Sequence, residues 1–225
     1  TEGRLDFQVS KDGATTVHHL GDTVLKPGIW YYVTAIYTGE ELRLYLNGAL
    51  DSEPTGFIGP IYQSKNPIYL GALVNTRADE FYDGVIDDIA FYKRALSEME
   101  TLSHFGNPAG VVGLWHFSER GGVLVDRSGY SHNAVPEGAI TYEYEGKLGS
   151  AIHLNGKDQY LETPTSFHLS PEGSYTLEAW IRPDALPKAG QEMAILSSAG
   201  GQSHFSLFLK GPEGHLVAST PMLGP

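Results

Sequence analysis

Two adjacent carboxylates, Asp87 and Asp88, lie in the segment DGVIDDIAFY, whose other residues are mostly those of a buried strand. A carboxylate that is buried in a protein core is costly unless it is paired or coordinates an ion. Successive strand residues point to opposite faces, so one of the two must face inward or lie at the end of the sheet. The segment therefore predicts either a cation site or carboxylates that cap backbone amides or pair with Lys93 or Arg94.

The same two carboxylates do not form a catalytic pair. Glycoside hydrolysis requires an acid and a base or nucleophile on either side of the bond, about 5–10 Å apart, whereas Asp87 and Asp88 point to opposite faces. Glu143 and Glu145 would share a face, but the Tyr and Gly residues around them indicate a loop or a sheet edge. No H-E-x-x-H or G-x-S-x-G motif occurs, and the nine histidines are interpreted as structural. We expect no catalytic residue and no enzymatic activity.

The composition narrows the possible partners. Asp and Glu number 27 against 15 Lys and Arg, a net charge of −12, which argues against a nucleic acid and favours cations or neutral ligands. The absence of cysteine excludes zinc ribbons, thiol catalysis and disulfide scaffolds. No apolar run is long enough to insert into a membrane. Because the chain begins with Thr1 and shows no signal peptide, we expect it to be part of a longer multidomain protein.

The elements that must position these residues are strands. LRLYLNG alternates Leu42, Leu44 and Leu46 with polar or aromatic residues, and WYYVTAIY is aromatic and β-branched throughout. Similar short segments, separated by Gly, Pro, Asn and Asp, recur along the chain and predict an antiparallel sandwich or barrel. One helix is expected in SEMETLSHFG, where Ser97 and Glu100 form a capping box.

Five segments together resemble the laminin-G-like, concanavalin A-like jelly roll, in the variety related to pentraxins. They are VGLWHFSERGGVLVDRSGYSHNAV with its D-x-S-G loop, KLGSAIHLNGKDQYLETP, SYTLEAWIRPD, GIWYYVTAIYTGEELRLYLNG and YDGVIDDIAFYKRALSEME. The resemblance covers essentially the whole chain. It implies an all-β, antiparallel jelly-roll β-sandwich with one short helix.

The order of these segments is unexpected. Residues 1–106 match the C-terminal half of the family, and residues 107–225 match its N-terminal half. Neither half could bury its hydrophobic face alone. We expect one permuted sandwich over residues 1–225; the alternatives are the ends of two tandem domains or an exchange of halves between chains.

The resemblance also implies a structural calcium ion. In glucanases of this fold, an Asp of the last strand holds calcium together with backbone carbonyls, and Asp87 occupies the matching position. The carbonyls are expected from Gly156, in LNGKDQY, and from the neighbourhood of His116. A set of oxygen ligands suits Ca²⁺, which accepts six to eight of them in loose geometry.

A carbohydrate ligand would need exposed aromatic rings and polar side chains that bond hydroxyl groups. Trp30, Trp115 and Trp180 lie in strand patterns and are expected in the core. The loop LVNTRADEFYDG and one exposed tyrosine are the better candidates. They provide four possible ligand residues: Asn75, Arg77, Asp79 and Tyr130.

These observations predict a noncatalytic binding module of a larger extracellular or cell-surface protein, with a glycan or an extracellular protein as its partner. The alternative is a structural or adhesive spacer that has no ligand of its own. A glycan-cleaving enzyme is the least favoured of the three classes.

Overall fold

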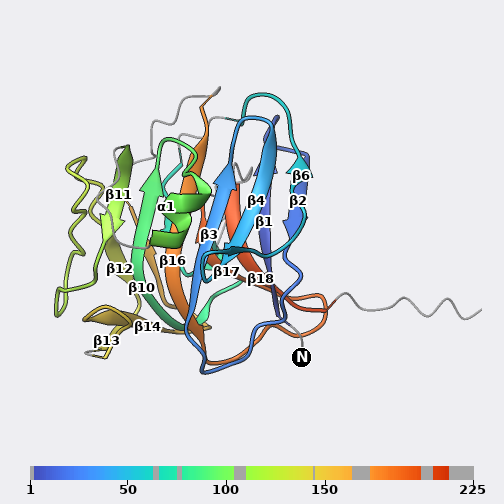
Figure 1. Ribbon diagram of the computed structural model, residues 1–225. Coiled ribbons are helices and arrows are strands. Elements are labelled where there is room, and N and C mark those ends of the chain that lie inside the picture. Colours follow the sequence, from blue (N-terminus) through green and yellow to red (C-terminus); the bar gives the residue numbers. More distant parts are fainter. Residues whose placement is uncertain are drawn as a thin grey trace, which may run out of the picture.

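The computed structural model describes residues 3–62, 66–74, 78–103, 110–143, 145–163, 173–198 and 205–212. Two antiparallel β-sheets pack face to face around one large hydrophobic core, to which both sheets contribute (Figure 1). The predicted all-β sandwich is confirmed.

The smaller sheet has seven strands. Its spatial order is β12 (Val135–Glu137), β15 (Tyr160–Glu162), β7 (Tyr69–Leu70), β17 (Glu192–Ser197), β18 (Phe205–Lys210), β1 (Arg4–Ser10) and β2 (Thr16–Leu20). It joins distant parts of the chain, because β1 pairs with β18.

The larger sheet has nine strands and carries the residues discussed below. Its path runs through β13 (Thr141–Glu143), β14 (Ala151–Asn155), β10 (Asp83–Tyr92), β16 (Tyr175–Pro183), β3 (Tyr31–Tyr37), β4 (Glu41–Leu46) and β5 (Ala49–Leu50). Beside this path, β11 (Val111–Trp115) pairs with β10 and β6 (Thr55–Gly56) pairs with β4. A separate pair is formed by β8 (Leu73–Val74) and β9 (Ala78–Asp79).

Both sheets combine strands from before residue 106 with strands from after residue 107. In the larger sheet, β16 is held between β10 and β3. The two parts of the chain thus complete each other's sheets here. The permuted order relative to the family stays a prediction.

The alternating pattern of β4 places its leucines as predicted: Leu42, Leu44 and Leu46 are all buried in the main core. Tyr45 points away from that core and is nevertheless buried, in a second cluster with Ile36 and Leu96. This second cluster lies on the outer face of the nine-stranded sheet. It forms because the segment around the helix covers part of that face (Figure 1).

That helix, α1 (Glu98–Ser103), begins as predicted. The Glu100 carboxylate accepts hydrogen bonds from the Ser97 amide at 2.9 Å and the Ser97 hydroxyl at 2.8 Å, which completes the capping box. The predicted continuation through residues 104–106 lies outside the described residues. Within the described part of the chain, no helix has the length and apolar character needed to cross a membrane.

Candidate functional site

Asp87 is completely buried in β10, at the point where the ladder is interrupted by a bulge. The next residue, Asp88, has a φ of 46°, which turns the chain and separates the two carboxylates. The Asp87 Oδ2 atom accepts a hydrogen bond from the Leu148 amide at 2.9 Å, whereas Oδ1 has no hydrogen-bond partner among the described residues. Burial, and to a smaller extent the neighbouring Asp88, raises the pKa of Asp87 to about 6. A buried oxygen without a partner needs an explanation, and a coordinated cation is one.

The glycine that lies against Asp87 is Gly146 rather than Gly156. A Cβ atom at position 146 would lie 2.6 Å from Asp87 Oδ2, so the loop before β14 packs directly on this carboxylate. Gly156 follows the other end of β14, where Asp83 pairs with Asn155. Its amide donates to the Tyr82 carbonyl at 3.0 Å. Gly156 therefore lies beside the start of β10, away from Asp87.

His116 follows β11 and lies beside the other carboxylate of the pair. Its Nδ1 atom forms a close contact with Asp88 Oδ1, and that hydrogen bond raises the pKa of His116. The structure thus brings the 146–149 loop to Asp87, pairs His116 with Asp88, and leaves Gly156 elsewhere. Asp87 with its uncompensated oxygen fits a calcium ligand, but the predicted trio of Asp87, Gly156 and His116 does not form one cluster.

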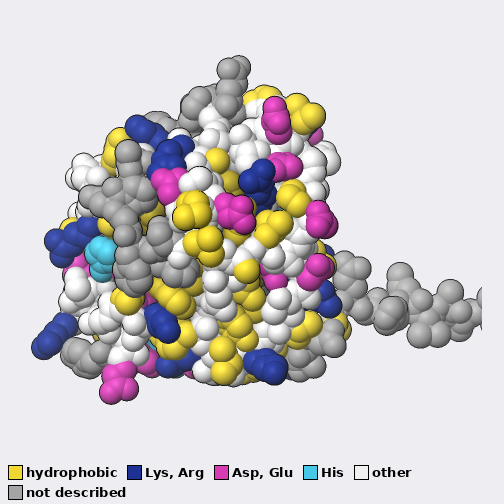
Figure 2. Space-filling model, in the orientation of Figure 1, with side chains coloured by type: hydrophobic (Ala, Val, Ile, Leu, Met, Phe, Trp, Pro, Cys, Tyr) yellow, Lys and Arg dark blue, Asp and Glu magenta, His cyan; other side chains and the backbone are white. Residues whose placement is uncertain are grey.

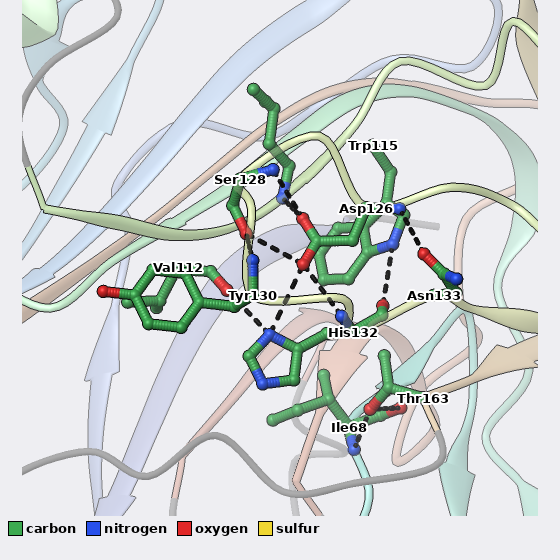
Figure 3. Close-up of polar contacts among 10 residues, drawn as sticks. Ile68, Val112, Trp115, Asp126, Ser128, Tyr130, His132, Asn133 and Thr163 are labelled. Atoms are coloured by element: carbon green, nitrogen blue, oxygen red, sulfur yellow. Dashed lines mark hydrogen bonds and ion pairs between the residues drawn. The ribbon is translucent and has the colours of Figure 1, made fainter.

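The D-x-S-G loop is held together by Asp126 (Figure 3). Its carboxylate accepts hydrogen bonds from the amides of Leu114 at 3.0 Å, Ser128 at 2.8 Å and His132 at 2.9 Å. Burial alone would raise the pKa of Asp126, but the hydrogen bonds, chiefly from Ser128, lower it overall. The Asp126 carboxylate is therefore already hydrogen-bonded to backbone amides.

Tyr130, predicted as a ligand residue, projects from this loop and is about half exposed (Figure 3). Its ring stacks on His132 with the ring centroids 6.0 Å apart, and its hydroxyl accepts a hydrogen bond from Lys93 Nζ at 3.1 Å. The other three predicted ligand residues are not brought to it by any described contact. Asn75 and Arg77 lie outside the described residues, and Asp79 is placed in β9 by its backbone only.

The three tryptophans do not share one environment. Trp115 is fully buried in the core, as predicted, and its Nε1 donates to the His132 carbonyl at 3.2 Å. The expectation that Trp30 and Trp180 are core residues is wrong. Both are only partly buried. Trp180 belongs to the even-numbered positions of β16, which point away from the core, Trp30 directly precedes β3, and α1 covers only part of this outer face.

Trp30 and Trp180 define a surface on the outer face of the nine-stranded sheet, which we call the tryptophan face. Arg182 lies over the Trp30 ring, with Cζ 5.3 Å from the ring centroid, and Lys147 Nζ lies 4.7 Å from the centroid of Trp180. Tyr32 flanks Trp180 at 5.2 Å between ring centroids. Figure 2 shows hydrophobic side chains beside Lys and Arg on the part of this face below α1.

The tryptophan face is connected to Asp87. Trp180 is the cross-strand partner of Asp87, and Lys147 belongs to the loop that packs on that carboxylate. One loop therefore covers the candidate cation ligand and contributes a cation to the aromatic surface. The sequence predicts that core-facing and outward-facing residues alternate in β16, but it does not predict which outward-facing residues the helix leaves uncovered.

Comparison with known proteins identifies part of the chain. Residues 1–100 match the family model described as the concanavalin A-like lectin/glucanases superfamily, Laminin_G_3. No curated protein and no solved structure matches the chain. The predicted laminin-G-like, concanavalin A-like resemblance is thereby confirmed for residues 1–100, and for the rest of the chain it stays a prediction.

Proposed function

We propose that this laminin-G-like sandwich is a noncatalytic carbohydrate-binding module of a larger extracellular protein, and that the tryptophan face contacts the sugar. The observation that carries the proposal is the pair of partly exposed indoles, Trp30 and Trp180, on one sheet face with Arg182 and Lys147 over their rings. Such partly exposed tryptophans combine apolar surface with a polar group.

The polar groups around the indoles supply the second requirement of a sugar site. The Arg182 guanidinium lies 3.4 Å from the Glu143 carboxylate, so donors and acceptors for hydroxyl groups stand next to the aromatic rings. Charges of both signs are present, which favours a neutral glycan over a strongly acidic one. A neutral ligand does not require a surface on which all charges have the same sign.

We further propose that Asp87 holds a structural Ca²⁺ through Oδ1, with carbonyl oxygens of the surrounding backbone as additional ligands. When bound, the ion would compensate the buried carboxylate. Since Lys147 lies in the loop on Asp87, fixing this loop would also fix the cation over Trp180. Glycan binding is then expected to depend on calcium.

The carboxylates of β10 support a noncatalytic role. Asp87 is inaccessible from the surface, and Asp88 is engaged with His116. Asp87 is the cross-strand neighbour of Trp180, but because it is buried and Asp88 is paired, neither carboxylate is presented to a glycan on this face as glycoside hydrolysis would require.

The test is a glycan array probed with the intact chain in calcium and again after metal removal with EDTA. Three variants accompany it: Trp180→Ala, Asp87→Asn and, as a matched aromatic control on another surface, Tyr130→Ala. Thermal melts of each variant verify that it is folded. We expect binding to be lost in W180A, to be insensitive to calcium in D87N, and to persist in Y130A.

Other outcomes would contradict the proposal in distinct ways. Loss of binding in Y130A with retention in W180A would place the sugar at the D-x-S-G loop instead. Glycan binding that is unchanged by EDTA and by D87N would contradict the proposed role of calcium. Failure of the folded wild-type chain to bind any glycan would favour a spacer.

A further inference from the structure

We propose that Asp83, His153 and Asp184 form a second divalent-cation site, with ligands distinct from Asp87, and that it takes a transition metal such as Zn²⁺. One potential ligand atom from each of these residues lies within 4.8 Å of the other two. The residues are far apart in the sequence, and β10, β14 and the end of β16 bring them together.

The register of the sheet explains why these three side chains meet. Asp83 begins β10 and pairs with Asn155 of β14, while His153 pairs with Val85 two positions further along. Asp184 directly follows β16, and its amide donates to the Asp83 carbonyl at 3.0 Å. The backbone positions of all three ligands are thus fixed by the ladder, and little reorganisation is needed to bind an ion.

The donor set differs from that expected for calcium. One imidazole nitrogen and two carboxylate groups match the preference of zinc and its neighbours, whereas calcium takes oxygen ligands. The His153 Nε2 atom lies 2.7 Å from Asp184 Oδ2, a hydrogen bond that a shared metal ion would replace. On the other side of the ring, His153 Nδ1 lies 3.9 Å from Glu143 Oε1. Metal-bound histidines commonly donate the second ring N–H to a carboxylate; the Glu143 carboxylate is near this nitrogen but beyond hydrogen-bond distance.

A cavity adjoins the cluster on the side of Asp83. Its volume is about 590 Å³, and its lining includes Asp83, Gly156, Phe81 and Glu192. Of the three proposed ligands only Asp83 lines it, and the approach to the ion is from the solvent beside Asp184, whose side chain is well exposed. Three protein ligands with open positions toward solvent are typical of a metal that also binds an exogenous group.

The Asp83 side chain packs closely against Gly156: a Cβ at position 156 would lie 2.5 Å from the Asp83 Cβ and 2.9 Å from its Cγ. Glycine at this position therefore leaves the space that the Asp83 side chain occupies.

This site is distinct from Asp87. Asp83 and Asp87 are four positions apart on one strand, which corresponds to about 13 Å. An ion at one position does not use the ligands of the other, and each can be removed without the other.

The experiment is calorimetric titration of the intact, metal-free chain with Zn²⁺, and with Ca²⁺ as the comparison ion. Co²⁺ is titrated in parallel, because its visible absorption reports nitrogen and oxygen ligation directly. The variants are His153→Gln and Asp184→Asn, of which Asp184 is well exposed and its replacement is expected to leave the fold intact. The matched control is His116→Gln, which removes the other described histidine–aspartate contact of this sheet, at Asp88.

We expect one Zn²⁺ per chain and an affinity reduced at least about tenfold in H153Q and in D184N. H116Q and D87N are expected to bind Zn²⁺ as the wild type does, and Co²⁺ absorption is expected to disappear only in the two site variants. The inference is overturned if the wild type shows no saturable Zn²⁺ binding. It is equally overturned if folded H153Q and D184N bind as tightly as the wild type, or if H116Q abolishes the binding.

Discussion

Replacing Gly156 by alanine is expected to destabilise the protein more than a simple backbone penalty allows. Gly156 has a φ of 66°, in the left-handed region, and a Cβ there would lie 2.5 Å from the Asp83 Cβ. Gly28 provides the matched control, because it has a φ of 76° and a Cβ at that position would contact nothing within 4 Å. Both variants incur the same conformational cost, and only one incurs the clash.

The magnitudes follow from these two contributions. A residue with a Cβ costs about 1–2 kcal/mol in the left-handed region, which is the whole expected loss for Gly28→Ala. Overpacking adds about 1–3 kcal/mol, so Gly156→Ala is expected to lose about 2–5 kcal/mol in total. The atoms that would be hit belong to the Asp83 Cβ and Cγ, whose positions are tied to β10, so they cannot simply rotate away.

The assay is urea denaturation of the wild type and both variants, with the free energy of unfolding taken from the midpoint and the slope. A domain of this kind has about 5–15 kcal/mol of stability, so the predicted difference is well within range. Equal losses in the two variants would refute the reasoning, because they would mean that Asp83 gives way at no cost. A larger loss in Gly28→Ala would show that the backbone conformation at position 28 matters more than the contact at position 156.

Three further predictions concern the fold. Ser97→Ala is expected to lose about 0.5–2 kcal/mol in the same denaturation assay, because it removes one side of the capping box; an unchanged midpoint would contradict the role of this cap. Leu44→Ala, in the main core, is expected to lose about 2–5 kcal/mol by the same measurement, and a loss below that of Ser97→Ala would argue against its burial. The hydrogen bond to Asp6 raises the pKa of His18 above its usual 6.5, so its stabilising effect is complete below pH 6.5 and is lost as the pH rises through the raised value. His18→Gln should therefore remove a decrease in stability seen above pH 6.5 in urea midpoints of the wild type, and an identical pH profile in both proteins would refute this.

The features that sequence predicted well depend on neighbours along the chain. The alternation of Leu42 and Leu44 reflects the two-residue period of a strand, and both side chains are in the core. The capping box spans only Ser97 and Glu100, so its hydrogen bonds form within one helical turn. The buried carboxylate of β10 could also be recognised from the sequence, because Asp87 lies in an otherwise apolar segment.

The candidate site was predicted only in part, because strand pairing decides which residues meet. Glycines occur at both ends of β14, and only the pairing of Asp83 with Asn155 places Gly156 at one end of β10 and Gly146 at Asp87. Glycine spacing contains no information about this choice. The same antiparallel register brings His153 beside Asp83.

The sequence by itself determined the kind of structure: an antiparallel sandwich with one capped helix and a carboxylate in a buried strand. The tertiary structure alone decided which surfaces are open and which polar groups converge. Trp30 and Trp180 are partly exposed because α1 covers only part of the outer sheet face, a result of how a distant segment packs. Local preferences act over a few residues, whereas exposure and convergence depend on contacts between segments more than a hundred positions apart, such as β1 with β18 or β3 with β16.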